Sequence, residues 1–107
     1  MRAGRLRHQV TLQKPVTNQD TYGQDVATWT DVATVWAGVE PLKGREFYDA
    51  QQVNAELSVR VVIRYRSDVA ATWRVKHGDR AYAIQQPPID PDMRHRELQL
   101  MCSELPA

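Results

Sequence analysis

The sequence predicts an all-β fold, a small antiparallel β-barrel of about six to seven strands with one short helix or long loop inserted at about residues 43–56. Several segments alternate apolar and polar residues with the period of two that is typical of half-buried strands. The connections between these segments are of hairpin length, which favours antiparallel neighbours. At this size a closed barrel is favoured because closure removes exposed strand edges.

Length and charge narrow the class of protein. The 107 residues predict one domain, residues 1–107. With 14 basic and 13 acidic residues the net charge is +1, which excludes a strongly basic nucleic-acid binder by composition but leaves a local basic surface open. No apolar run approaches the roughly 20 residues of a membrane helix, and no secretory signal is evident. The single cysteine, Cys102, excludes an intramolecular disulfide and fits a reducing compartment.

The first predicted strand covers residues 8–14, where Val10 and Leu12 alternate with polar residues. We expect it to end at Pro15, since proline cannot donate to a β-ladder. The polar stretch that follows predicts a long hairpin loop, in which Gly23 supplies a positive φ.

The second predicted strand, residues 26–40, is long or broken, and we expect a bend near Asp31 or Gly38. Its inward face carries small apolar residues, and Trp36 lies on the opposite face with Glu40. The three tryptophans are expected in core or interface packing: Trp29, Trp36 and Trp73.

A short helix is predicted at residues 44–53, after Pro41 ends the strand. Phe47, Ala50 and Val53 recur every three residues, which indicates about two and a half helical turns. Isolated helices below about 12 to 15 residues are marginal in water. This segment must therefore dock on something or stay mobile until it does.

The clearest strand covers residues 57–66. One face carries Leu57, Val59, Val61, Ile63 and Tyr65, and the other carries Ser58, Arg60, Val62, Arg64 and Arg66. Further strands are predicted at residues 72–77, 80–86 and 97–103, with a tight turn at Gly78 and Asp79. Their expected inward residues are Trp73, Val75, Tyr82, Ile84, Leu98, Leu100 and Cys102.

Residues with catalytic or metal-binding potential do not form recognisable motifs. His8, His77 and His95 lack metal-ligand spacing, and we expect them at the surface or rim. Cys102 is expected to be a small core residue. Neither a serine-hydrolase elbow nor a phosphate-binding loop is present. We therefore predict no enzyme, no catalytic residue, no metal, no cofactor, no membrane partner and no small-molecule substrate.

Basic residues form the candidate face for a polyanion or an acidic partner: Arg60, Arg64, Arg66, Arg74 and Lys76. We expect their two strands to pair as a hairpin, which places like charges opposite each other unless something neutralises them. Three alternatives remain open: ion pairs with Asp68, Asp79 or Glu97 of this chain, an acidic neighbouring subunit, or DNA phosphates. The last gives an alternative function, a nucleic-acid-binding OB-like barrel using Arg60, Arg64 and Arg66.

Several segments share a family pattern in order and spacing across nearly the whole chain. They are Gly4-x-Leu6-Arg7-His8 leading into VTLQKP, then TYGQDVATWTDV, VWAGVEPLKGREFYDAQQ, VRVVIRYR, DRAYAIQ, Asp90 and ELQLMC. This pattern resembles the head–tail joining proteins of tailed bacteriophages, also called head closure or head-completion proteins.

The resemblance implies a structural virion protein of a phage or prophage. It implies a homo-oligomeric ring of portal-matched symmetry at the head–tail interface, assembled in the bacterial cytoplasm, which closes the DNA-filled head. Adaptor and tail proteins would be partners, with packaged DNA nearby and no sequence-specific binding. Residues 43–56 would be a gating loop or a helix on a neighbour. The candidate interface residues are Arg45, Glu46, Phe47, Tyr48 and Gln51, with the two aromatics as anchors.

Overall fold

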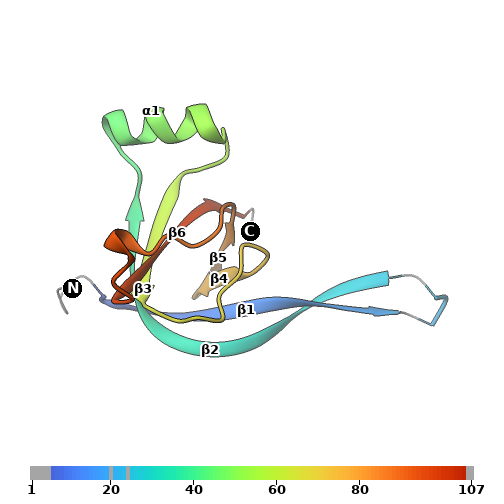
Figure 1. Cartoon of the computed structure of the whole chain (residues 1–107). Helices are drawn as coiled ribbons and strands as arrows, with labels where there is room; N and C mark the ends of the chain where they lie inside the picture. The colour runs from blue at the N-terminus through green and yellow to red at the C-terminus, as the bar shows by residue number, and fades with distance from the viewer. Residues whose placement is uncertain (1–5, 20, 24, 106–107) are drawn as a thin grey trace.

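A closed barrel of six antiparallel strands forms the body of the protein, in the order β1-β2-β3-β6-β5-β4 (Figure 1). The computed structural model describes residues 6–19, 21–23 and 25–105. The elements are β1 (His8–Gln19), β2 (Asp25–Pro41), α1 (Gly44–Val53), β3 (Val59–Arg64), β4 (Arg74–His77), β5 (Arg80–Ile84), the 3-10 helix η2 (Pro91–Met93) and β6 (Glu97–Glu104). The predicted all-β barrel with one short helix is therefore confirmed.

The barrel interior is filled by the inward residues that alternation predicted. Its core consists of Val10, Leu12, Ala37, Val59, Val61, Ile63, Val75, Tyr82, Ile84, Leu98, Leu100 and Cys102. Trp73 is half-buried against this core, whereas Trp29 and Trp36 are 38% and 54% exposed, so of the two predicted alternatives, core or interface packing, only interface packing remains for these two. Cys102 is buried and its thiol donates to the Leu100 carbonyl at 3.3 Å, as expected of a small core residue.

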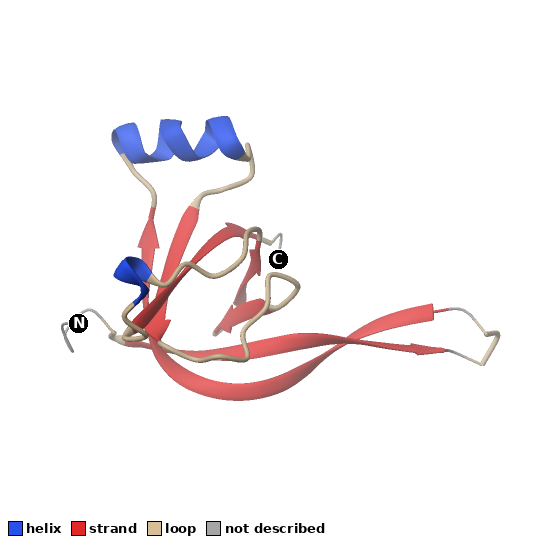
Figure 2. Ribbon diagram, viewed as in Figure 1, coloured by secondary structure: helices blue, strands red, loops and turns tan. Residues whose placement is uncertain are grey.

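A two-stranded ribbon projects from the barrel and gives the molecule its 47 Å long axis (Figure 2). The strand β1 continues through Pro15, which pairs with Trp29, so the prediction that Pro15 ends the strand is wrong. Beyond Gln13, β1 has β2 on one side only. Proline is tolerated there because an edge strand does not need a donor on its outer side.

A β-bulge bends the ribbon where it leaves the barrel. Leu12 pairs with Ala33, whereas Gln13 pairs with Asp31, so Val32 is the extra residue. An extra residue on one strand increases local twist and bends that strand. The predicted bend near Asp31 is confirmed, and the curvature of β2 is visible in Figure 1.

The basic strands β3 and β4 do not form the predicted hairpin. The neighbours of β3 are β2 and β6, whereas β4 pairs with β1 and β5. The strand β6 has eight residues and pairs with all six residues of β3, whereas β4 has four. The longer ladder therefore occupies the free edge of β3, and β4 closes the barrel against β1.

The turn between β4 and β5 provides a test of backbone conformation. Gly78 has φ +60°, and a Cβ atom there would meet nothing within 4 Å. Gly78→Ala should therefore cost only the left-handed strain, about 1 kcal/mol of the free energy of unfolding, measured by chemical denaturation. Gly78→Asn is the matched control and should cost less, because asparagine adopts this conformation readily. Equal stability of the alanine variant and the native protein would contradict the positive φ.

Candidate functional site

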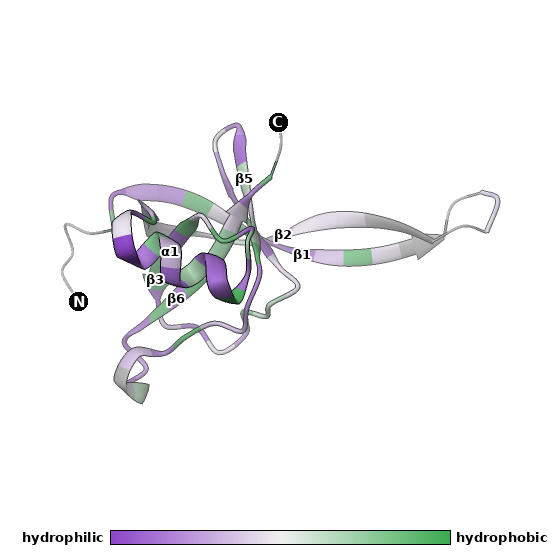
Figure 3. Cartoon of the chain, turned by 90° about the horizontal axis from the view of Figure 1, so that it is seen from above, coloured by the Kyte–Doolittle hydropathy of each residue, from purple (hydrophilic) through white to green (hydrophobic). Residues whose placement is uncertain are grey.

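The helix α1 stands off the end of the barrel, between β2 and β3 (Figure 1), and in the view from above it is projected over β3 and β6 (Figure 3). It begins at Gly44 and ends at Val53, as predicted, and none of its residues is buried. Among the described residues, no helix is long and apolar enough to span a membrane. An unburied helix of ten residues is marginal on its own, so its polar attachments to the barrel matter.

Two polar contacts hold α1 to the barrel. Glu46 forms an ion pair with Arg60 of β3, and Arg60 also lies 3.7 Å from Glu40 of β2. Near the other end, Gln51 donates from Nε2 to the Leu57 carbonyl at 2.5 Å. Of the candidate interface residues, Glu46 therefore contacts a barrel strand, and Gln51 contacts the segment that leads from α1 into β3.

The remaining candidate interface residues lie on different sides of α1. Phe47 is half-buried, whereas Arg45 is exposed and Tyr48 is 69% exposed. The Phe47 and Tyr48 rings meet edge to face with centroids 6.0 Å apart. Val53, 73% exposed, adds apolar surface at the end of the helix. The exposed part of α1 thus combines an aromatic ring with aliphatic and charged groups, a composition that suits protein contact.

The five predicted basic residues do not form one face. On β3 and the loop after it, Arg60 pairs with acids of β2 and α1, and Arg66 forms two hydrogen bonds of 3.0 and 2.9 Å with Asp68. The Arg66 hydrogen bond lowers the pKa of Asp68. Arg64 is exposed, but Val62 between these arginines is fully buried, so this side of β3 is not a uniformly solvated face.

The β4 residues belong to a separate surface. Arg74 donates to Oε1 of Gln13 at 2.6 Å and lies 4.4 Å from the centre of the Trp29 ring, and Gln13 in turn donates to Asp31 at 2.6 Å. Lys76 is exposed. Because β3 and β4 are not neighbours in the barrel, the prediction of one continuous basic face is wrong. The OB-like alternative names Arg60, Arg64 and Arg66 on the β3 side alone, so this strand order does not test it, although Arg60 and Arg66 already form ion pairs with acids of this chain.

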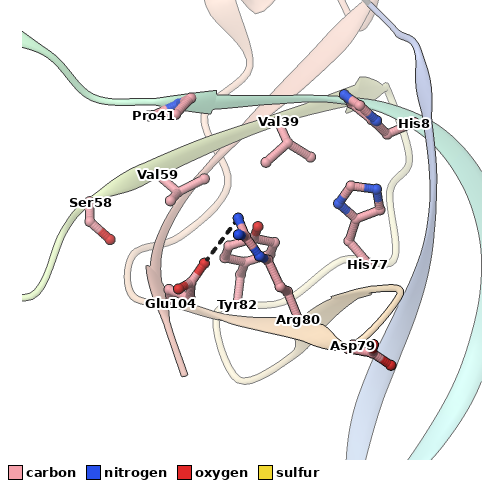
Figure 4. Close-up of a pocket in the computed structure, with 10 residues that line it drawn as sticks. All are labelled: His8, Val39, Pro41, Ser58, Val59, His77, Asp79, Arg80, Tyr82 and Glu104. Atoms are coloured by element: carbon pink, nitrogen blue, oxygen red, sulfur yellow. Dashed lines mark ion pairs between the residues drawn. The ribbon is translucent and has the colours of Figure 1, made fainter. Parts of the chain in front are cut away.

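A cavity of about 670 Å³ opens at the α1 end of the barrel (Figure 4). Apolar side chains of Val39, Val59 and Tyr82 line it beneath a charged rim. On the rim, Arg80 and Glu104 lie 3.7 Å apart, and a hydrogen bond with Tyr82 raises the pKa of Arg80. An apolar lining with charged groups at the rim is the usual composition of a binding cavity.

Two histidines meet at this rim although 69 positions separate them. The rings of His8 and His77 have centroids 4.8 Å apart, because the pairing of β1 with β4 brings the two strands together. This contact can be predicted only when the pairing of β1 with β4 is known. Across the described ranges, no group of three or more His, Cys, Asp or Glu side chains could hold a metal ion. Burial raises the pKa of Cys102 to about 12, so its thiol stays protonated at neutral pH.

A small closed barrel with a projecting ribbon and an exposed helix presents apolar side chains, such as Trp36 and Tyr48, that its own core does not cover. The chain belongs to the phage head completion protein family, whose family model matches residues 1–105. It is 34% identical over 76 residues to the head completion protein gp7 of Enterobacteria phage HK97, covering 71% of this chain and 68% of gp7.

Two solved structures share the fold. The solution structure of protein SF1141 from Shigella flexneri 2a has a TM-score of 0.75 and 34% sequence identity, over 97% of this chain and 96% of that one. A chain from the virion of a native gene transfer agent particle has a TM-score of 0.62 at 21% identity, over 96% and 98% of the two chains. Family membership gives this chain a structural role in the phage particle.

Proposed function

We propose that this protein forms a homo-oligomeric ring in the head–tail connector, where it closes the DNA-filled head and provides the surface on which the tail docks. Membership of the head completion protein family supports a role at the stage of assembly when the head is completed. The observation that carries the proposal is α1, which stands off the barrel with none of its residues buried. Such a helix gains apolar contacts only when another subunit covers it.

The proposed ring needs a head-to-tail interface, in which two different patches of each subunit meet. Helix α1 supplies one patch, with Phe47 and Tyr48 as anchors and Arg45 at its exposed side. Glu46 and Gln51 position the helix through their contacts with Arg60 and Leu57. The symmetry of the ring would match the symmetry of the portal. Adaptor and tail proteins would contact the two ends of the ring.

A deletion strain tests this function. Without the protein, we expect electron microscopy to show DNA-filled heads without tails, or heads that have lost their DNA. Supplying the native chain in the bacterial cytoplasm should restore tailed particles that contain it. Tailed, infectious particles from the deletion strain would contradict the proposal.

A further inference from the structure

The projecting ribbon has two free strand edges. The strand β1 pairs with β4 only at Thr11–Gln13, and β2 pairs with β3 only at Ala37–Pro41. Among the described residues, no backbone hydrogen bond outside the strand ladders involves residues 14–19 or 29–36. Unpaired edges of this length readily accept another strand.

Exposed tryptophans accompany the free edge of β2. Val10 and Leu12 face the core, so the alternate residues of β1 face outward together with their cross-strand partners. Trp36 pairs with Gln9 and Trp29 pairs with Pro15, which places both tryptophans on the outer face of the ribbon. The Trp29 ring lies against Arg74 of β4, on the β1 side of the ribbon, whereas Trp36 is available at the β2 edge. Exposed tryptophan is enriched at protein interfaces.

The two edges differ in how they receive a strand. Residues 29–36 of β2 contain no proline and one charge, Asp31. The edge of β1 carries Lys14 and Pro15, residues that hinder edge-to-edge pairing, and only residues 16–19 beyond them are unhindered. A second strand can therefore add to most of the β2 edge, but only to the tip of the β1 edge.

Strand direction makes the two edges complementary. They lie on opposite sides of one ribbon and run in opposite directions. When copies stand side by side with their ribbons tilted to the ring axis, β2 of one copy therefore meets β1 of the next in antiparallel sense, displaced along the ribbon so that residues 16–19 lie beside the segment 29–36. Repeating this step by rotation closes a ring, whereas pairing β2 with β2 would stop at a dimer.

We propose that residues 16–19 of β1 in one copy pair with four residues within the segment 29–36 of β2 in the next copy, with Trp36 covered at the contact. This pairing rests on the proposed ring. It makes the ribbon a contact between neighbouring subunits, in addition to α1. Main-chain hydrogen bonds between the two strands hold the copies together, and Trp36 fixes the position of the pairing along the strand.

Cysteine cross-linking tests the pairing. Thr17→Cys and Thr34→Cys place thiols on the outer face of the two edges, and Cys102 does not interfere because it is buried. Within one chain Thr17 pairs with Ala27 and Thr34 with Thr11, so the two sites are six residues apart along β1, roughly 20 Å. A short bis-maleimide added to assembled particles should give a ladder of chain multiples with the double variant. Each single variant should give none.

Each contrary result has a distinct meaning. Dimers from Thr34→Cys alone would indicate β2–β2 pairing and overturn the proposal. Particles that are completed normally but give no ladder would also overturn it, and would leave the proposed function intact. Only tailed, infectious particles from the deletion strain would contradict that function.

Trp36→Ala supplies a second measurement. Trp36 is 54% exposed, so its loss should leave thermal stability unchanged but reduce ladder yield at least tenfold. Met93→Ala on η2, where the side chain is 86% exposed, is the matched control and should leave the yield unchanged. An unchanged ladder with Trp36→Ala would overturn the claim that the tryptophan is covered.

Discussion

Leu100→Ala is expected to lower the free energy of unfolding by about 3 kcal/mol. Leu100 is fully buried in the barrel core, on β6 opposite Val61 of β3. Every strand of a closed barrel is paired on both sides, so the surrounding backbone has little freedom to collapse into the space that the leucine leaves. A loss of this size is a large fraction of the 5–15 kcal/mol typical of small domains. The melting temperature should fall by about 15 °C.

The matched control is Val53→Ala at the end of α1, where the side chain is 73% exposed. Its effect should stay within about 0.5 kcal/mol, because it removes no core contact. Chemical denaturation followed by circular dichroism measures both variants. Equal destabilisation by the two substitutions would mean that the barrel interior is not the source of stability.

Alternation along the chain predicted which residues face the core but not which strands pair. The inward sets around Ile63 and Leu100 were correct because a period of two depends only on the strand itself. Neighbours in a barrel depend on matching strand lengths and on closure, which no single segment encodes. The hairpin between β3 and β4, and with it the continuous basic face, was inferred from adjacency in sequence and is absent from the fold.

The same limit explains the error at Pro15 and why the tryptophans could not be assigned to core or interface. The rule that proline ends a strand holds where both edges are paired, and the sequence does not reveal that β1 has a free outer edge beyond Gln13. Likewise, alternation assigns Trp36 to the face opposite the core without showing whether another element covers that face. Helix α1 was predicted with correct ends because Pro41, the loss of alternation and the three-residue spacing are all local signals.

Replacing Phe47 and Tyr48 together by alanine should abolish head completion while leaving the barrel folded. Interface anchors of this kind each contribute about 2 kcal/mol or more, so each subunit contact should weaken roughly a thousandfold. Electron microscopy should show heads without tails, and infectivity should be lost. The melting temperature should change little, because neither side chain belongs to the barrel core.

The polar contacts that hold α1 in place make it possible to distinguish a variant that fails to assemble from one that has lost its structure. The contacts of Glu46 with Arg60 and of Gln51 with the Leu57 carbonyl do not involve the aromatic rings, so the double variant should retain a helix held to its barrel. Alanine at Asp49 and Gln52, two exposed positions of the same helix, is the matched control and should preserve infectivity. If the aromatic variant also completes heads normally, α1 is not an anchor and the subunit contact must lie elsewhere. If the variant fails but its helix no longer exchanges amide hydrogens slowly, the aromatics act by holding α1 in place. Infectivity and hydrogen exchange measured on the same variants therefore decide whether the helix binds a neighbour through these rings.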